Sequence, residues 1–206
     1  MSTPELERAL FDAVARDDVA TARALIDAGA DVNAKNARED SAFLYAGAEG
    51  LNEILALTLD RGADVTSTNR FGGTALIPAA EHGHVDTVRM LIEAGVPVDH
   101  VNEPGWTALL EAVVYGDGSD RYQDVVRLLL DAGADRSIED ADGRTALSMP
   151  SGAGRSPWRR CCGPGDEPGQ VRPIRSRDCS RISTLRTLPV TVIGNSSTTC
   201  TYFGIL

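Results

Sequence analysis

The stretch TALIPAAEHGHVDTVRMLIEAGVPV, Thr74 to Val98, decides the fold of this chain. Apolar residues share one face of a short helix, Gly83-His84 turns the chain, and further apolar residues recur at helical spacing. Gly95 then stands where the end of a helix favours a left-handed residue. The stretch predicts two helices joined by a tight turn, with these apolar positions: Leu76 and Ala79 in the first, and Val88, Leu91 and Ile92 in the second.

The same pattern recurs at an offset of 33 residues, so that Ser41 aligns with Thr74. One step back it covers Arg8 to Val32, and one step forward it begins at Thr107. Neither helix of a unit can bury its apolar face alone, so neighbouring units must stack into a continuous core. We therefore expect an all-α solenoid with units at about residues 8–40, 41–73, 74–106 and 107–144 and a partial fifth unit from 145.

These units resemble the ankyrin repeat, and the resemblance covers about residues 8–148. The family phrases include TAL at Thr74, DAGADVNAK from Asp27 and DAGAD from Asp131. The usual Pro-Leu-His after the threonine reads Ala-Leu-Ile or Ala-Leu-Leu here, so we expect apolar contacts to replace the hydrogen bonds between threonine and histidine that brace a typical repeat. The resemblance implies an ankyrin-repeat solenoid of helix-turn-helix units with hairpin loops between them.

The fourth unit carries an insertion. From Thr107 to Thr145 the spacing is 38 residues rather than 33, and the extra residues fall within GDGSDRYQD, Gly116 to Asp124. Because Gly116 is expected to end the first helix and Val125 to open the apolar pattern of the second, we expect the insertion to enlarge the turn between the helices. A solenoid tolerates such an insertion without losing its register.

Two compositions share the chain. Residues 1–148 hold 12 Lys and Arg against 27 Asp and Glu, a net charge of −15, whereas residues 149–206 hold 8 Arg against 3 acidic residues, a net charge of +5. All four cysteines and six of the ten prolines lie in the second part. We therefore expect residues 149–206 to form a basic tail of low order, either disordered or non-native.

A change of reading frame near residue 148 or 149 is our preferred hypothesis for this tail. Reading the messenger one base earlier would place alanine at 150, leucine at 162 and apolar residues at 158 and 161. Counted from Thr145, these are the places where the repeat pattern has an alanine and the apolar residues of its second helix. The alternative is a genuine disordered tail rich in Pro, Gly, Ser and Arg.

The motifs favour neither a catalytic nor a metal site. No G-x-S-x-G, P-loop or dinucleotide fingerprint occurs, so we expect no enzyme activity and no cofactor. The tail cysteines lack C-x2-C spacing, and His82 and His84 fit the turn of a repeat better than a zinc site, which needs more ligands. EDADG and GDGSD resemble fragments of a calcium loop without its closing glutamate, so we expect turns there.

The charge and hydropathy of the chain also bear on its partners. The acidic residues 1–148 argue against nucleic acid, whose phosphates they would repel. No stretch approaches the roughly 18 apolar residues of a membrane span, and the start MSTPELERAL has no leader pattern. We expect a cytoplasmic protein that binds neither nucleic acid nor membrane.

The resemblance implies protein binding through hairpin tips and first-helix side chains. We expect a bacterial-type adaptor or inhibitor that binds a protein with a basic patch. The alternative is a structural or protective accessory protein that acts beside an enzyme without a tight, dedicated partner. Aromatic and arginine side chains supply much of the binding energy of interfaces. The candidate partner-binding residues are Arg38, Tyr45, Arg70, Phe71, Glu103, Trp106 and Glu111.

Overall fold

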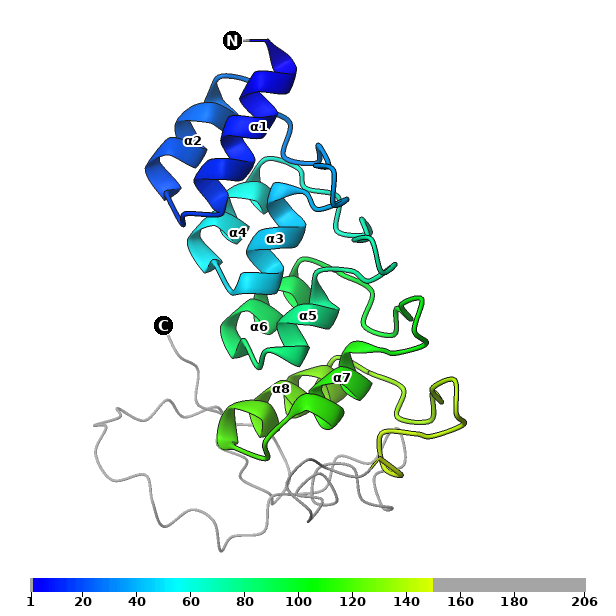
Figure 1. Ribbon diagram of the computed structural model, residues 1–206. Helices are drawn as coiled ribbons and strands as arrows, with labels where there is room; N and C mark the ends of the chain where they lie inside the picture. The colour runs from blue at the N-terminus through cyan, green and yellow to red at the C-terminus, as the bar shows by residue number, and fades with distance from the viewer. Residues whose placement is uncertain (1, 150–206) are drawn as a thin grey trace, which may run out of the picture. The chain divides into compact units, whose positions relative to one another are not determined.

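The computed structural model describes residues 2–149, and helices make up about half of that range (Figure 1). Strand structure within these residues is limited to one isolated bridge between Glu139 and Thr145. The described part of the chain is therefore all-α, as the repeat predicts. Its helices are α1 (Thr3–Val14), α2 (Val19–Asp27), α3 (Ala42–Glu49), α4 (Asn52–Asp60), α5 (Leu76–Glu81), α6 (Val85–Glu93), α7 (Ala108–Tyr115) and α8 (Asp120–Asp131).

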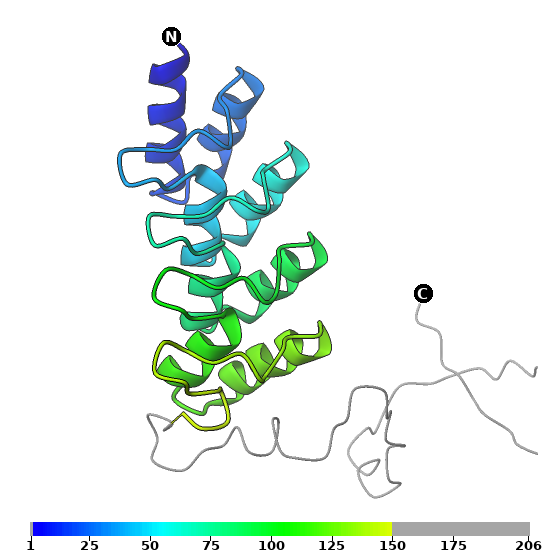
Figure 2. The ribbon, with the colours of Figure 1, turned by 90° about the vertical axis from the view of Figure 1, so that its right-hand side faces the viewer.

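The helices form four pairs that stack along one axis (Figures 1 and 2). The first helices α1, α3, α5 and α7 lie in one row and the second helices in another, and each hairpin loop extends beyond the first-helix row. Neighbouring helices pack within each row, and one hydrophobic core runs through the stack. The predicted core positions Leu76, Ala79, Val88 and Leu91 are buried, and Ile92 is partly buried against them. The solenoid prediction is confirmed.

Two of the repeat's hydroxyl residues cap a first helix. Ser41 Oγ accepts a hydrogen bond from the Leu44 N–H at 3.2 Å, and Thr107 Oγ1 accepts one from the Leu110 N–H at 3.2 Å. Each bond satisfies one of the backbone donors that the first turn of a helix leaves free. These residues therefore fix where α3 and α7 begin.

Thr74 holds the same position in the third unit but does not cap its helix. Pro78, four residues on, lacks the N–H that in the neighbouring units bonds to the carbonyl of the capping residue. The Ile77 N–H bonds to the Thr74 carbonyl at 3.2 Å instead, and α5 begins only at Leu76. Thr74 Oγ1 is left buried without a hydrogen-bond partner among the described residues.

Apolar side chains occupy the positions where a typical ankyrin repeat has histidine. These residues are Leu44, Ile77 and Leu110, and all three are buried in the core. The expected exchange of polar bracing for apolar contacts is therefore confirmed at this row. Gly95 also behaves as predicted, because its φ of 85° is left-handed and follows the end of α6.

The insertion in the fourth unit lengthens α8. This helix has 12 residues where α6 has 9, because it begins at Asp120, well before the apolar pattern opens at Val125. Tyr122, on the added turn, is buried, and its hydroxyl donates to the Glu81 carbonyl at 2.8 Å. The prediction that the insertion enlarges the inter-helix turn is wrong for most of its length. The added residues make a helical turn that packs on the preceding unit.

The chain makes one further turn on the core after Thr145. The Met149 N–H donates to the Thr145 carbonyl at 3.2 Å, and the side chains of Ala146 and Met149 are buried. The tail is predicted to begin at residue 149, but Met149 belongs to the packed repeats. The remaining predictions on the tail, its low order and its reading frame among them, concern residues 150–206 and lie outside the described residues.

Candidate functional site

Each hairpin is closed by the side chain of an Asn or Asp residue. In the second hairpin, Asn69 Oδ1 accepts hydrogen bonds from the N–H groups of Phe71 at 2.9 Å and Gly73 at 3.1 Å. Such side chains favour turns because they bond to backbone groups a few residues on. The equivalent closing residues of the other hairpins are Asn36, Asn102 and Asp140.

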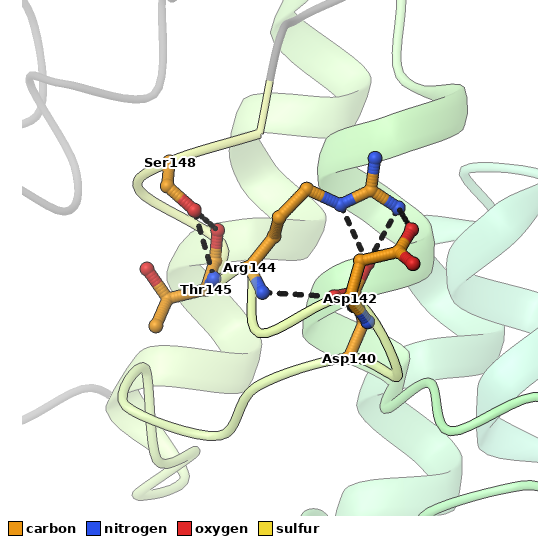
Figure 3. A network of polar contacts seen from close by, with 5 residues as sticks. All are labelled: Asp140, Asp142, Arg144, Thr145 and Ser148. Carbon is orange, nitrogen blue, oxygen red and sulfur yellow. Dashed lines mark hydrogen bonds and ion pairs between the residues drawn. The ribbon is translucent and has the colours of Figure 1, made fainter.

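The fourth hairpin adds ion pairs to this closure (Figure 3). The Arg144 guanidinium lies 2.8 Å from Asp140 Oδ2 and 2.6 Å from Asp142 Oδ2. Burial by itself would raise the pKa of Asp140, but hydrogen bonds from Arg144 and from the Asp142 backbone lower it below its ordinary value. The segment EDADG is therefore a hairpin turn, as predicted, with both aspartates of the tip bound to arginine.

Hydrogen bonds between successive hairpins hold the tips in register. Asn33 Oδ1 accepts from the Asp64 N–H at 2.8 Å, and Asn33 Nδ2 donates to the Gly62 carbonyl at 3.1 Å. Further along the stack, the Glu103 N–H donates to the Phe71 carbonyl at 2.9 Å. Side chains on neighbouring tips are thus presented at fixed positions, which lowers the entropy lost when a partner binds them.

A groove of about 240 Å³ lies between the first two hairpin tips and the helices α3 and α5. It brings together four of the seven predicted partner-binding residues, which come from three different segments of the chain. The rest of its lining is mixed, with apolar residues from the helices and carboxylates at its rim. The lining residues are Arg38, Asp40, Leu44, Tyr45, Ala48, Glu49, Asn69, Arg70, Phe71, Thr74, Ala75 and Pro78. We call this surface the tip groove.

The aromatic residues of the tip groove differ in exposure. Phe71 is 51% exposed, and the Arg70 guanidinium carbon lies 4.6 Å from the centroid of its ring. Tyr45 is half-buried, with its ring edge-on to that of Phe11 at 5.2 Å between centroids. Phe71 and Arg70 therefore form a free, stacked pair at the rim, whereas Tyr45 is held in place by the core.

A separate hollow of about 280 Å³ lies between α1 and the first hairpin. Phe11, Lys35 and Asn36 are among its lining residues. None of the seven predicted partner-binding residues lines it, so the tip groove is the stronger candidate.

The other three predicted residues lie one repeat further along the stack, and two of them are less exposed than the sequence suggested. Glu103 is exposed at its tip, as expected. Trp106 is half-buried against the core, with its ring 5.8 Å from that of Tyr115 between centroids. Glu111 is only 8% exposed. Its expected place among exposed first-helix side chains is wrong, because α7 packs closely against α5 on one side and the third hairpin covers it.

Glu111 is an unusual group for a buried position. Its Oε1 accepts a hydrogen bond from Asn102 Nδ2 at 3.3 Å, but Oε2 is buried with no hydrogen-bond partner among the described residues. Burial, and after it the charge of Glu81, raise the pKa of Glu111 from 4.5 to about 7. Burial and the charges of Glu111 and Glu81 also raise the pKa of Tyr115. The charge of Glu81 therefore acts on both Glu111 and Tyr115.

Sequence reasoning missed Tyr115 and Thr74. Tyr115 is 55% exposed and faces Trp106, although its position at the end of a helical apolar pattern suggested nothing special. A signal for Thr74 was available, since Pro78 stands where the helix needs an N–H.

The described residues offer no cluster of three or more His, Cys, Asp or Glu side chains that could hold a metal ion. His82 Nδ1 lies 2.8 Å from the Ala48 carbonyl, and the ring of His84 packs against Gly50, where an added Cβ would lie 2.9 Å from it. Burial, followed by the charge of His82, lowers the pKa of His84. None of the helices between residues 2 and 149 is long and apolar enough to cross a membrane.

Comparison with known proteins gives matches over most of the described range. Residues 42–140 match the family model of ankyrin repeats in three copies, and residues 8–37 match the model of a single ankyrin repeat. A comparison with curated proteins found no significant match.

Two solved structures are similar to the chain at high sequence identity. One is the crystal structure of an ankyrin repeat domain from Acinetobacter baumannii AYE, with 58% identity and a TM-score of 0.67. The other is the crystal structure of an ankyrin repeat protein, with 51% identity and a TM-score of 0.65. Each match covers 68% of this chain and 71% of the other.

Proposed function

Because the chain belongs to the ankyrin repeat family, whose repeats are generally protein-protein interaction modules, we propose that it binds a protein partner through the tip groove. The family is also generally non-catalytic, so binding itself is the proposed activity. The observation that carries this proposal is the convergence of Arg38, Tyr45, Arg70 and Phe71 on one groove.

The composition of the tip groove suits a protein segment. Interfaces concentrate binding energy in aromatic and arginine side chains surrounded by less important contacts. Phe71 and Arg70 provide such a pair at the rim, and Tyr45 provides a rigid aromatic surface inside. The carboxylates of Asp40 and Glu49 border the same groove, so the partner segment there has both acidic and basic groups to meet.

The net charge of the repeats supports a partner that is basic elsewhere. Residues 1–148 carry −15, and such a surface attracts a basic protein over several ångströms and speeds its approach. We expect the association rate to fall steeply with added salt, because screening weakens this attraction.

The proposal is tested by affinity capture with the full chain and two variants. The combined Arg70→Ala and Phe71→Ala change removes the exposed pair, and the Arg89→Ala change removes an exposed arginine on α6, outside the tip groove. We expect the paired change to weaken binding of a stoichiometric partner by about tenfold or more, and the control to leave it unchanged. Both variants should melt like the unaltered chain, because the altered side chains are exposed.

Equal capture by all three chains would refute the tip groove as the binding surface. Capture of no stoichiometric partner from the native cell would instead favour the accessory role without a dedicated partner.

A further inference from the structure

The next segment of the same face, between α5 and α7, differs in charge from the tip groove. Residues 33 apart hold equivalent places in successive repeats, so each groove residue has a counterpart one unit on. The counterparts of three of them are all glutamates. They are Glu81 for Ala48, Glu103 for Arg70 and Glu111 for Pro78. The face therefore passes from a segment with two arginines and two carboxylates to one with three carboxylates.

The carboxylate of Glu111 is prepared for a partner that the described residues do not supply. It is 8% exposed, Asn102 Nδ2 holds Oε1 at 3.3 Å, and Oε2 has no hydrogen-bond donor. A buried acceptor without a donor costs free energy, so a donor that arrives with a binding partner recovers that cost. The Asn102 bond also fixes the orientation of the carboxylate, so that the free oxygen is held in place.

Aromatic rings stand beside this carboxylate. Trp106 and Tyr115 lie with their ring centroids 5.8 Å apart, and Tyr115 is 55% exposed. Burial first, and then the charges of Glu111 and Glu81, raise the pKa of Tyr115, so the phenol lies near both carboxylates. A carboxylate with aromatic faces next to it is the surrounding that a guanidinium or ammonium group favours, through ion pairing and contact with the rings.

We propose that Glu111, Glu81, Trp106 and Tyr115 form an anchoring site for an arginine or lysine side chain of the protein partner. The proposal rests on the proposed function, since the anchor belongs to the same binding face. It adds which part of the partner carries positive charge. The partner segment that lies along α5 and α7 presents a cation, whereas the partner segment at the tip groove contacts Arg38 and Arg70. The side-chain cation packs against the exposed ring of Tyr115 and donates to Glu111 Oε2, which is buried until the partner displaces the groups that cover it.

The test uses the full chain and ethylguanidinium, which reproduces the end of an arginine side chain, with butylammonium as the lysine counterpart. Nuclear magnetic resonance follows the Trp106 indole and the Tyr115 ring during titration. We expect saturable shifts of both, and a loss of affinity of about tenfold or more in Glu111→Gln. The control Glu53→Gln removes an exposed carboxylate from α4, in the other helix row, and should change nothing.

Shifts that do not saturate, or that survive Glu111→Gln, would overturn the anchoring site. A chain in which the eight arginines beyond Met149 are replaced by glutamine tests a second occupant. If that chain binds ethylguanidinium more tightly than the unaltered chain, the chain's own C-terminal segment fills the site and the intermolecular anchor is refuted. Equal affinity of the two chains supports the proposal.

The titration needs no partner, so it separates this inference from the proposed function. If ethylguanidinium binds but no partner is captured, the cation site at Glu111 is supported and the proposed function is contradicted. If a captured partner binds Glu111→Gln and the unaltered chain with equal affinity, only the anchoring site is contradicted.

Discussion

The third and fourth helix pairs share a threonine start and the same backbone pattern, yet their first helices differ. α7 begins directly after Thr107, whose hydroxyl caps it, and has eight residues. α5 begins two residues after Thr74, has six residues, and leaves the threonine hydroxyl unbonded. The residue four places on is Pro78 in one unit and Glu111 in the other, so a single missing N–H accounts for the later start of α5 and the unbonded hydroxyl. Equivalent places in a repeat can therefore carry different local chemistry.

The largest expected effect is the loss of stability when a core leucine is truncated, and it should be similar in the two units. Leu91 in α6 and Leu129 in α8 are both fully buried, and replacing either with alanine should cost about 2–5 kcal/mol of unfolding free energy. Chemical denaturation of Leu91→Ala and Leu129→Ala measures both costs. A much smaller cost at Leu129 would show that the insertion loosens the fourth core.

The second effect concerns the place held by Pro78 in one unit and Glu111 in the other. With its pKa raised from 4.5 to about 7, Glu111 binds its proton more tightly in the folded chain, so its contribution to stability is lost as pH rises between those values. The unfolding free energy of Glu111→Gln minus that of the unaltered chain should therefore be about 1–3 kcal/mol larger at pH 8 than at pH 4. Melting curves of both chains across this range measure the difference, and parallel pH profiles would contradict it.

The third effect separates the two threonines. Thr107→Val removes a helix cap and should cost about 0.5–2 kcal/mol. Thr74→Val removes a buried hydroxyl that has no partner, so it should leave stability unchanged or raise it. Denaturant titrations of the two variants provide the comparison. Equal losses at both places would mean that the Thr74 hydroxyl is bonded in solution.

The smallest effect would convert one unit into the other. Pro78→Ala restores the missing N–H, so α5 should begin earlier and the Thr74 hydroxyl should gain its role as a cap. In that background Thr74→Val should become destabilising, with a coupling between the two changes of about 0.5–1 kcal/mol. A double-mutant cycle measures this coupling, and a value of zero would break the explanation through the proline.

Much of the fold follows from the sequence, because the 33-residue period, the helical spacing of apolar residues and Gly95 all act locally. The added turn of α8 was harder to predict from the sequence, since Ser119 and Asp120 are typical both of a loop and of the start of a helix. The tip residues Arg70 and Phe71 were placed correctly by register alone. The burial of Glu111 was not, because it depends on how closely α7 and the third hairpin pack, which spacing along one helix does not describe.

The contact of Tyr122 with the Glu81 carbonyl affects the order in which the stack comes apart. In a linear array, each unit normally detaches from the end at the cost of one interface. Here the added turn of α8 reaches across that interface and closes it with a buried ring and a hydrogen bond. Pulling on the C-terminal side should therefore release the third and fourth units together in one step, so that the smallest mechanical unit at this end is a pair of repeats.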